Sequence, residues 1–250
     1  MKRIISDDRR QKIATKEYYD RYYLPEHSGY LTAARTDAET ARMWQWVGHA
    51  PISVCDIACG NGRHLASFAR RGVASGFGFD YSPPLVSAAR KALKKYPKFL
   101  VAQRSFASWR PRRNMYELVY FLFSSLGHCL KNSDAQSLIR RVVAATVPGG
   151  SIVCDTDSIF RLQRYLRSHQ AKGGDARRYR YDSRRRMLYS HEPFGKSIIM
   201  QQTRYYSKEE LKRIFIRAGI RARNIAFYGG FDGSAYTKHS KRLIVVAKKG

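Results

Sequence analysis

The stretch ISVCDIACGNGRHLASFARRGVASGFGFD, residues 52–80, contains the pattern that decides the fold. A short apolar run over residues 52–58 ends in a turn, C-G-N-G, and a helical pattern follows over residues 63–71. A second apolar run, residues 74–79, ends on the acid Asp80. This order predicts a compact β-α-β unit made of strand, glycine turn, helix, strand and carboxylate.

Turns of this kind bind nucleotide-like cofactors, because glycine lets the backbone approach a ligand and the helix start presents free N–H groups. Asp80 at the tip of the second strand can accept two hydrogen bonds from the vicinal hydroxyls of a ribose. The pattern is not the dinucleotide one, G-x-G-x-x-G, because Leu65 stands where the third glycine belongs. The alternative is a turn that needs glycine for its backbone alone.

An acid, Asp56, precedes the turn and gives D-I-A-C-G-N-G over residues 56–62. This resembles motif I of class I S-adenosylmethionine (SAM)-dependent methyltransferases, usually D/E-x-G-x-G-x-G, with Ala58 at the first glycine position. Two later segments resemble the same family: the P-G-G turn at 148–150 and the ending YGGFDGSAYTKHSKRLIVVAK at 228–248. The resemblance covers about residues 18–249.

The resemblance implies an α/β fold, namely a seven-stranded Rossmann-like sheet with helices on both faces. It also implies SAM as the cofactor, with Asp80 holding the ribose. Members differ widely in substrate, so the resemblance indicates the fold and the methyl donor better than the acceptor. No metal site is predicted. We expect one domain over residues 1–250, with a helical lead-in at 1–50 and a basic insertion after the fifth strand, residues 158–206, that forms a lid.

The resemblance assigns a set of residues to the cofactor. The two glycines of the turn are expected to approach the amino-acid half of SAM, and the preceding acid to fix the turn or receive the ammonium through water. The pair after the strand at 99–103 stands where the family often has an acid and a small residue beside the adenine. A tyrosine from EYYDRYY, residues 17–23, is expected either to cover the sulfonium or only to pack on the domain. The predicted residues are Asp56, Ala58, Gly60, Gly62, Arg63, Asp80, Tyr81, Ser105, Phe106, Phe121 and Tyr19.

The strand at residues 117–122 and the loop after it resemble motif IV of the same family, and the resemblance implies that the acceptor lies beside this loop. His128 is the candidate base, since an imidazole can accept a proton near neutral pH. Ser124 and Ser125 are candidates to hydrogen-bond the acceptor. The alternatives are that His128 only packs the loop, and that an amine acceptor needs no base.

The lead-in is expected to hold helices over residues 12–23 and 36–47. The apolar fraction of 44% supports a folded core, and no apolar run reaches the length of a membrane span. The start, MKRIISDDRR, lacks the apolar core of a signal peptide. With four cysteines in or beside apolar runs, these features predict a cytoplasmic protein with reduced thiols.

The net charge of +28 favours a polyanionic partner, because cationic side chains gain affinity for phosphates through counterion release. Residues 158–190 hold ten Lys or Arg against two Asp, with tyrosines interleaved, and residues 104–113 form a second basic segment. These segments predict an RNA partner, and RNA or another polyanion as the methyl acceptor. Two alternatives stay open: a small-molecule methyltransferase whose charge is incidental, and a non-catalytic RNA-binding assembly factor with a protein partner.

Overall fold

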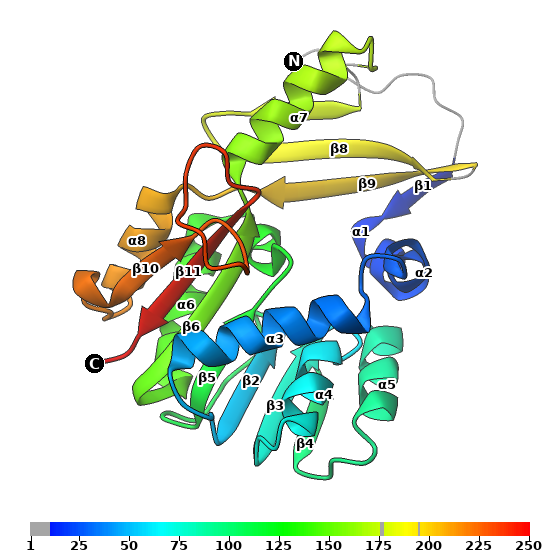
Figure 1. Ribbon diagram of the computed structural model, residues 1–250. Helices are drawn as coiled ribbons and strands as arrows, with labels where there is room; N and C mark the ends of the chain where they lie inside the picture. Colours follow the sequence, from blue (N-terminus) through cyan, green and yellow to red (C-terminus); the bar gives the residue numbers. More distant parts are fainter. Residues whose placement is uncertain (1–10, 176–177, 195) are drawn as a thin grey trace.

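The computed structural model describes residues 11–175, 178–194 and 196–250. The described residues form two sheets (Figure 1). The larger has seven strands in the order β10-β11-β6-β5-β2-β3-β4, and β11 runs antiparallel to both of its neighbours. The smaller has the order β1-β9-β8-β7 and lies above one end of the larger sheet.

The first half of the large sheet follows the predicted β-α-β order. The strand predicted at 52–58 is β2 (Ser53–Ile57), and the next is β3 (Ser75–Asp80), with α4 (Arg63–Arg70) between them. Then come α5 (Pro83–Ala92), β4 (Phe99–Gln103) and β5 (Tyr116–Phe121). Since β2, β3, β4 and β5 are parallel neighbours, their carboxyl ends meet at one edge, where ligands bind in open α/β sheets.

Helices cover both faces of this sheet (Figure 1). Side chains of α6 (Asn132–Ala145) and α8 (Lys208–Arg217) bury against one face, with Leu138 and Phe215 fully enclosed. Side chains of α3 (Ala33–Val47), α4 and α5 bury against the other, with Met43 and Phe68 fully enclosed. The remaining strands are β6 (Thr146–Asp157), β10 (Ile225–Tyr228) and β11 (Arg242–Lys248), and the short helical turns are η2 (Ser125–His128) and η3 (Ala222–Asn224).

The lead-in differs from the prediction of a helix over residues 12–23. It begins with β1 (Gln11–Ala14), which pairs in parallel with β9, and continues through α1 (Thr15–Glu17), a π-helical turn, η1 (Tyr18–Tyr22), and α2 (Tyr23–His27). The long-range pairing with β9 overrides the local helical preference, which is why the first four residues are extended. The second helix, α3, starts earlier than predicted because the hydroxyl of Thr32 caps it by accepting from Arg35 N.

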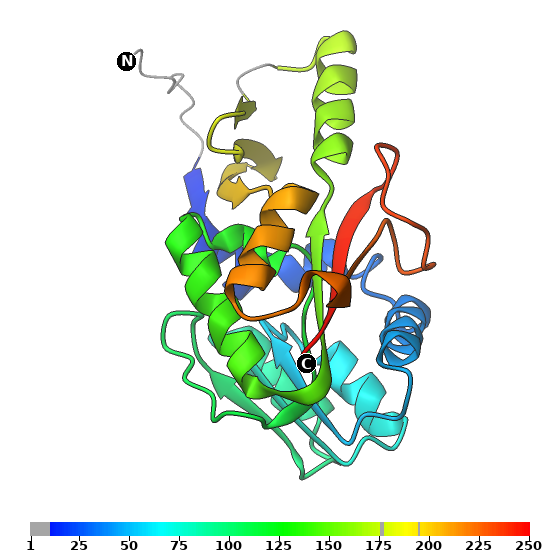
Figure 2. The ribbon, with the colours of Figure 1, turned by 90° about the vertical axis from the view of Figure 1, so that its left-hand side faces the viewer.

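The basic insertion folds into a helix and three strands. After α7 (Ile159–Ala171), β7 (Tyr179–Asp182), β8 (Met187–Phe194) and β9 (Ser197–Arg204) form an antiparallel meander that β1 completes. We call the four strands the lid sheet. Figure 2 shows α7 on one side of it, above the large sheet. The lid sheet rests on η2: a Cβ at Gly127 would lie 2.9 Å from Thr203 Cγ2.

The described part of the chain contains no helix that is long and apolar enough to cross a membrane. All four cysteines, at positions 55, 59, 129 and 154, are buried free thiols.

Candidate active site

The glycine turn takes a left-handed backbone at three alternate positions. The φ angles are 58° at Ala58, 54° at Gly60 and 73° at Gly62. A Cβ on Gly60 would meet nothing within 4 Å, so the backbone at this position is open to a ligand. A Cβ on Gly62 would lie 2.9 Å from the Cβ of Ala89 in α5, so this glycine is required for close packing of two helices. Gly62 does not line the cavity described below, and the structure does not place it with the other predicted cofactor residues.

Asp80 ties the end of β3 to the glycine turn. Its Oδ2 accepts a hydrogen bond from Gly60 N at 3.0 Å, and its Oδ1 accepts one from Ser82 N at 3.0 Å. The side chain is buried, and burial raises its pKa although these backbone donors oppose the rise. Each carboxylate oxygen has a second lone-pair direction, so Asp80 can hold two further hydroxyl donors on its cavity side.

Asp56 at the end of β2 is a buried acid with an unfilled acceptor. Its Oδ2 meets no donor of standard hydrogen-bond geometry among the described residues, although the Tyr120 hydroxyl and Arg63 act on it electrostatically. Burial raises the pKa of Asp56 well above its usual range. A buried acceptor on a cavity wall attracts a cationic donor from a ligand. The residue therefore fits the ammonium group of an amino-acid ligand such as that of SAM.

These side chains line one wall of a cavity of about 550 Å³, a size typical of small-molecule sites. The N-terminal segment, by which we mean residues 11–31, covers the cavity with Tyr18, Tyr19, Tyr23 and Tyr30, and the lid sheet closes it with Gln201. Of the predicted residues, those that line the cavity are Tyr19, Asp56, Ala58, Gly60, Arg63, Asp80, Tyr81, Ser105, Phe106, Ser125 and His128. Phe121 does not: its side chain is fully enclosed in the core beneath the sheet.

The loop after β4 is held firmly against the sheet. Ser105 and Ser108 hydrogen-bond each other within a turn, and Arg141 Nη2 donates to Phe106 O at 2.7 Å. Trp109 is 1% exposed and packs on Phe79, with ring centroids 5.2 Å apart. The Ser105 hydroxyl and the backbone of Phe106 are therefore fixed where the adenine of SAM is expected.

Tyr19 and His128 meet across the cavity. The Tyr19 hydroxyl oxygen lies 3.0 Å from His128 Nε2, and the two rings meet edge to face at 5.5 Å. Burial lowers the pKa of His128 and raises the pKa of Tyr19. Both are therefore neutral at pH 7, and the phenol can donate its proton to the imidazole nitrogen.

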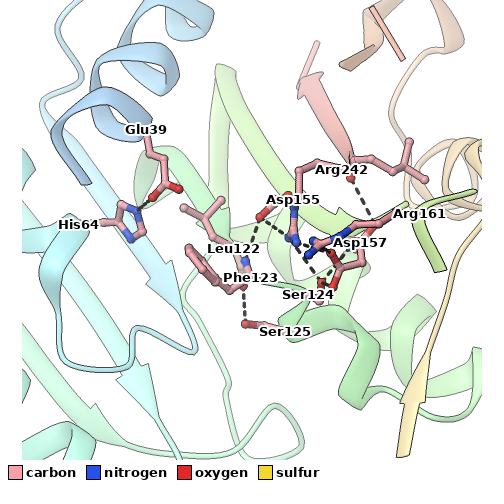
Figure 3. A network of polar contacts seen from close by, with 12 residues as sticks. Glu39, His64, Leu122, Phe123, Ser124, Ser125, Asp155, Asp157, Arg161 and Arg242 are labelled. Atoms are coloured by element: carbon pink, nitrogen blue, oxygen red, sulfur yellow. Dashed lines mark hydrogen bonds and ion pairs between the residues drawn. The ribbon is translucent and has the colours of Figure 1, made fainter. Parts of the chain in front are cut away.

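A buried ionic network shapes the loop after β5 (Figure 3). Arg242 of β11 holds both carboxylate oxygens of Asp155, each at 2.6 Å, and reaches Asp157 Oδ1 at 2.6 Å. Asp155 Oδ2 accepts from Phe123 N at 2.9 Å. Phe123 and Ser124 have φ angles of 56° and 62°, so the network holds two residues in a strained left-handed backbone.

The hydroxyls of the two candidate serines, Ser124 and Ser125, both form hydrogen bonds that stabilise this loop. The Ser124 hydroxyl donates to Asp157 Oδ2 and accepts from Asp157 N, and it lies outside the cavity lining. The Ser125 hydroxyl donates to Leu122 O at 2.6 Å, and this residue does line the cavity. The structure thus brings Ser125 together with His128 and separates Ser124 from them.

A second ionic network joins α3 to the start of α4. Glu39 is 2% exposed and accepts hydrogen bonds from Arg35, Arg63 and His64. Burial alone would raise the pKa of Glu39, but His64 and Arg63 lower it to about 2. Burial lowers the pKa of His64 to about 4. Arg63 is therefore an anchored side chain of the cavity wall whose charge is already matched.

Sequence reasoning missed several side chains of this site. Asp155 and Arg242 appeared only as parts of expected strands, Asp157 fell between the expected fifth strand and the insertion, and Glu39 was part of an expected helix. One signal was present: two acids at 155 and 157 sit at the end of an otherwise apolar strand, where a charge requires a partner. The metal-ligating residue types form no cluster able to hold a metal ion within the described ranges.

The comparisons with known proteins agree with this geometry. Residues 54–150 match a family described as a methyltransferase domain. The chain is similar to dTDP-3-amino-3,4,6-trideoxy-alpha-D-glucopyranose N,N-dimethyltransferase of Streptomyces venezuelae, with 26% identity over 141 residues, 56% of this chain and 55% of that protein. The match therefore spans about half the length of that relative.

Two solved structures share the fold over nearly their whole length. The CcbJ methyltransferase of Streptomyces caelestis aligns with a TM-score of 0.67 and 17% identity, covering 88% of this chain and 99% of that one. SAM-bound CalS10 of Micromonospora echinaspora, an amino pentose methyltransferase, aligns with a TM-score of 0.61 and 14% identity, covering 92% and 96%. Identities this low indicate a common fold.

The family match over residues 54–150, the motif I turn and the fold shared with the solved structures are those of class I SAM-dependent methyltransferases. The predicted family and α/β fold are confirmed. SAM is the methyl donor of this family, and the prediction of SAM as the cofactor is confirmed at that level.

Proposed function

We propose that the protein transfers a methyl group from SAM to a small-molecule acceptor bound in the cavity between the large sheet and the lid sheet. The observation that carries this proposal is the enclosure of the cavity. The N-terminal segment and the lid sheet both contribute lining residues, and the volume of about 550 Å³ is that of a small-ligand site. The names of two relatives, which act on amino sugars, support an amine-bearing acceptor of similar size.

The residues proposed to hold SAM are those at the carboxyl ends of β2, β3 and β4. Asp56 would receive the ammonium, Asp80 the ribose hydroxyls, and Phe106 would flank the adenine ring. When bound, SAM would supply an electrophilic methyl carbon: the acceptor's lone pair would form a bond to it as the bond from that carbon to sulfur breaks, with S-adenosylhomocysteine as the leaving group. The remaining tasks of the protein are to orient the acceptor and to remove its proton.

We propose that Tyr19 and His128 accept that proton, since the Tyr19 hydroxyl and His128 Nε2 lie 3.0 Å apart on the cavity. The acceptor donates its proton to the Tyr19 oxygen while Tyr19 gives its own proton to His128 Nε2, along the hydrogen bond of 3.0 Å. Because burial lowers the pKa of His128, the imidazole is neutral and available as the final base at pH 7. The acceptor itself is proposed to contact the polar wall made by Gln201, Asp157 and Arg161, which line the cavity beside this pair.

Binding of SAM is the first test. Calorimetry is expected to show micromolar binding by the wild-type protein and a loss of roughly tenfold or more in Asp80→Ala, because hydrogen bonds to a charged group contribute about 1.5–3 kcal/mol. Asp134→Ala, an exposed acid of α6, is the matched control and is expected to bind normally. Intact SAM affinity in Asp80→Ala would overturn the cofactor placement. Absence of binding in the wild type would favour the non-catalytic assembly factor.

The acceptor class is tested by transfer of labelled methyl from SAM. We expect label in nucleotide-linked amino sugars or other small amines, and none in RNA from a host extract. RNA as the acceptor remains the second candidate, supported by the charge of +28 and the arginines of the insertion. Label that nuclease releases from RNA would replace the small-molecule proposal with this one.

A further inference from the structure

The two faces of the lid sheet have different chemistry. Side chains alternate between faces along a strand, and directly paired residues share a face. Gln201 pairs with Ser190 and lines the cavity. Tyr179, also paired with Ser190, lies on the same face, and its uncharged hydroxyl is 2.8 Å from the hydroxyl of Tyr165 in α7. The next residue, Gln202, points to the opposite face, which we call the outer face.

The outer face carries a cross-strand row of basic and aromatic side chains. Arg180 pairs with Tyr189, which pairs with Gln202, and the next row on the same face is Asp182, Met187 and Arg204. The Arg180 Cζ lies 4.0 Å from the Tyr189 ring centroid, a cation–π contact. Arg180 and Gln202 are exposed, so the row is presented to solvent.

This row continues into a second, shallow cavity of about 270 Å³, lined by Leu130, Arg184, Arg185, Met187, Tyr189, Gln202 and Arg204. We call it the lid groove. Arg184 and Arg185 lie exposed in the turn between β7 and β8, and the Arg185 side chain is 77% exposed, 3.9 Å from Asp182. Arg204 is paired with Glu210, yet its Nε is buried and has no acceptor among the described residues.

The lid groove thus combines three guanidinium groups, an aromatic ring and an amide in one concave surface. Guanidinium groups bind phosphate oxygens through paired N–H donors, and the faces of tyrosine and arginine stack on unpaired bases. A duplex would present its phosphates but not the faces of its bases, so the ring favours a single strand. The methyl-transfer cavity, on the other face of the sheet, uses none of these residues.

We propose that the lid groove binds single-stranded nucleic acid, with phosphates on Arg184 and Arg185 and a base stacked on Tyr189 and Arg180. Charge complementarity supports this occupant: the insertion at 158–190 holds ten Lys or Arg against two Asp in a chain of net charge +28. This proposal is independent of the acceptor. It makes the basic lid a docking surface, while the acceptor enters the cavity on the other face.

The test is fluorescence anisotropy of the full chain with a labelled 12-nucleotide oligouridine RNA at salt concentrations from 0.05 to 0.3 M. Each phosphate neutralised on a single strand contributes about −0.7 to the slope of log K against log salt. Arg184→Ala/Arg185→Ala is therefore expected to reduce that slope by about 1.4 and the affinity by roughly twentyfold at 0.1 M salt. Tyr189→Ala is expected to weaken binding about tenfold with little change of slope, because stacking is lost.

Arg221→Ala/Arg223→Ala is the matched control. It removes the same charge from exposed positions on the turn before β10, and we expect a small, non-specific loss of affinity. Equal losses in the two double variants would show that only the overall field attracts RNA, and would overturn the groove. Normal RNA binding by Arg184→Ala/Arg185→Ala, or binding of phosphatidylglycerol vesicles without RNA binding, would overturn it too.

Circular dichroism and SAM calorimetry on the same variants separate this proposal from the methyltransferase. Since the groove residues lie outside the cofactor cavity, SAM affinity is expected to be unchanged in all of them. If the protein bound RNA through the groove but did not bind SAM, the proposed function would be overturned and the groove proposal would stand.

Discussion

The Tyr19 hydroxyl lies 3.0 Å from His128 Nε2 and links two segments 109 positions apart in the chain. One partner comes from the N-terminal segment and the other from the turn after β5, so the pair forms only when the N-terminal segment covers the cavity. The same contact therefore closes the cavity and completes the proposed proton path.

Substitution of either partner is expected to lower kcat for methyl transfer. Tyr19→Phe removes the hydroxyl and His128→Gln removes the base, and general-base catalysis contributes roughly 10²–10⁴-fold. Because the two act as one unit, the double variant is expected to be no slower than the worse single variant. Steady-state kinetics with SAM and an amine acceptor measure this, with Tyr22→Phe as the control. Multiplying effects in the double variant would show that the residues act separately.

Loss of Arg242 is expected to destabilise the fold strongly. Its removal would leave Asp155, 1% exposed, as an unpaired buried charge, which costs about 3–5 kcal/mol. Arg242→Leu should therefore lower the midpoint of urea unfolding far more than Arg223→Ala, an exposed control. Arg242→Lys keeps the charge but not the two-pronged contact, so an intermediate loss is expected. A loss below 1 kcal/mol in Arg242→Leu would mean that Asp155 is protonated or solvated.

His64 predicts a dependence of stability on acid pH. Its pKa is lowered to about 4 in the folded chain, whereas an unfolded histidine titrates near 6.5. The unfolded state therefore binds the proton first, and His64 contributes stability that is complete above pH 6.5 and falls as the pH drops toward 4. Asp56, Asp80 and Asp155, with raised pKa values, act in the opposite direction, so the comparison must be between variants.

Urea unfolding at pH 8, 6.5 and 5 checks this point. Relative to the wild type, His64→Gln is expected to lose less stability between pH 6.5 and 5, since glutamine keeps a donor for Glu39 but does not titrate. His49→Gln, which replaces a histidine that is 57% exposed, is the control for the loss of an imidazole at the surface. Parallel profiles for His64→Gln and the wild type would contradict the assignment.

Ala58→Gly is expected to stabilise the protein. Alanine at a φ of 58° costs about 1–2 kcal/mol, and the added chain entropy of glycine offsets roughly half of that. The net gain of roughly 0.5–1 kcal/mol would raise Tm by about 2–3 °C in a chain of this size. Ala74→Gly, at a position without positive φ, should lower or leave unchanged the Tm. A decrease in Ala58→Gly would show that the methyl group contributes packing.

The alternation of strands and helices was predictable because periodicity and turn residues are local signals. The β-α-β unit, the acid at the end of β3 and the ending of the chain all follow from short stretches, and they also identify the family. The strand β1 was not predictable in this way, because its extended backbone depends on β9, far along the chain.

The candidate site was predictable where a motif supplies the residue and not where tertiary contacts do. Asp56, Gly60 and Asp80 lie together on the cavity, as the motif implied. Gly62 instead packs against Ala89, and the Ser124 hydroxyl donates to Asp157, so both residues stabilise the fold next to the cavity and do not line it. No local pattern marks Glu39 or Arg242, whose partners come from distant segments. The RNA partner remains a prediction.

The pairing of β1 with β9 has a consequence for the order of folding. Thr15 donates a hydrogen bond to Met200 O across 185 positions, so β1 has no partner until the chain has been made as far as Met200. The motif I unit, with short-range parallel pairing, can form earlier. During synthesis on the ribosome, the N-terminal strand must therefore wait while the large sheet assembles, and its docking is among the last steps. The ends of β2, β3 and β4 that line the cofactor cavity thus form before the N-terminal segment covers them.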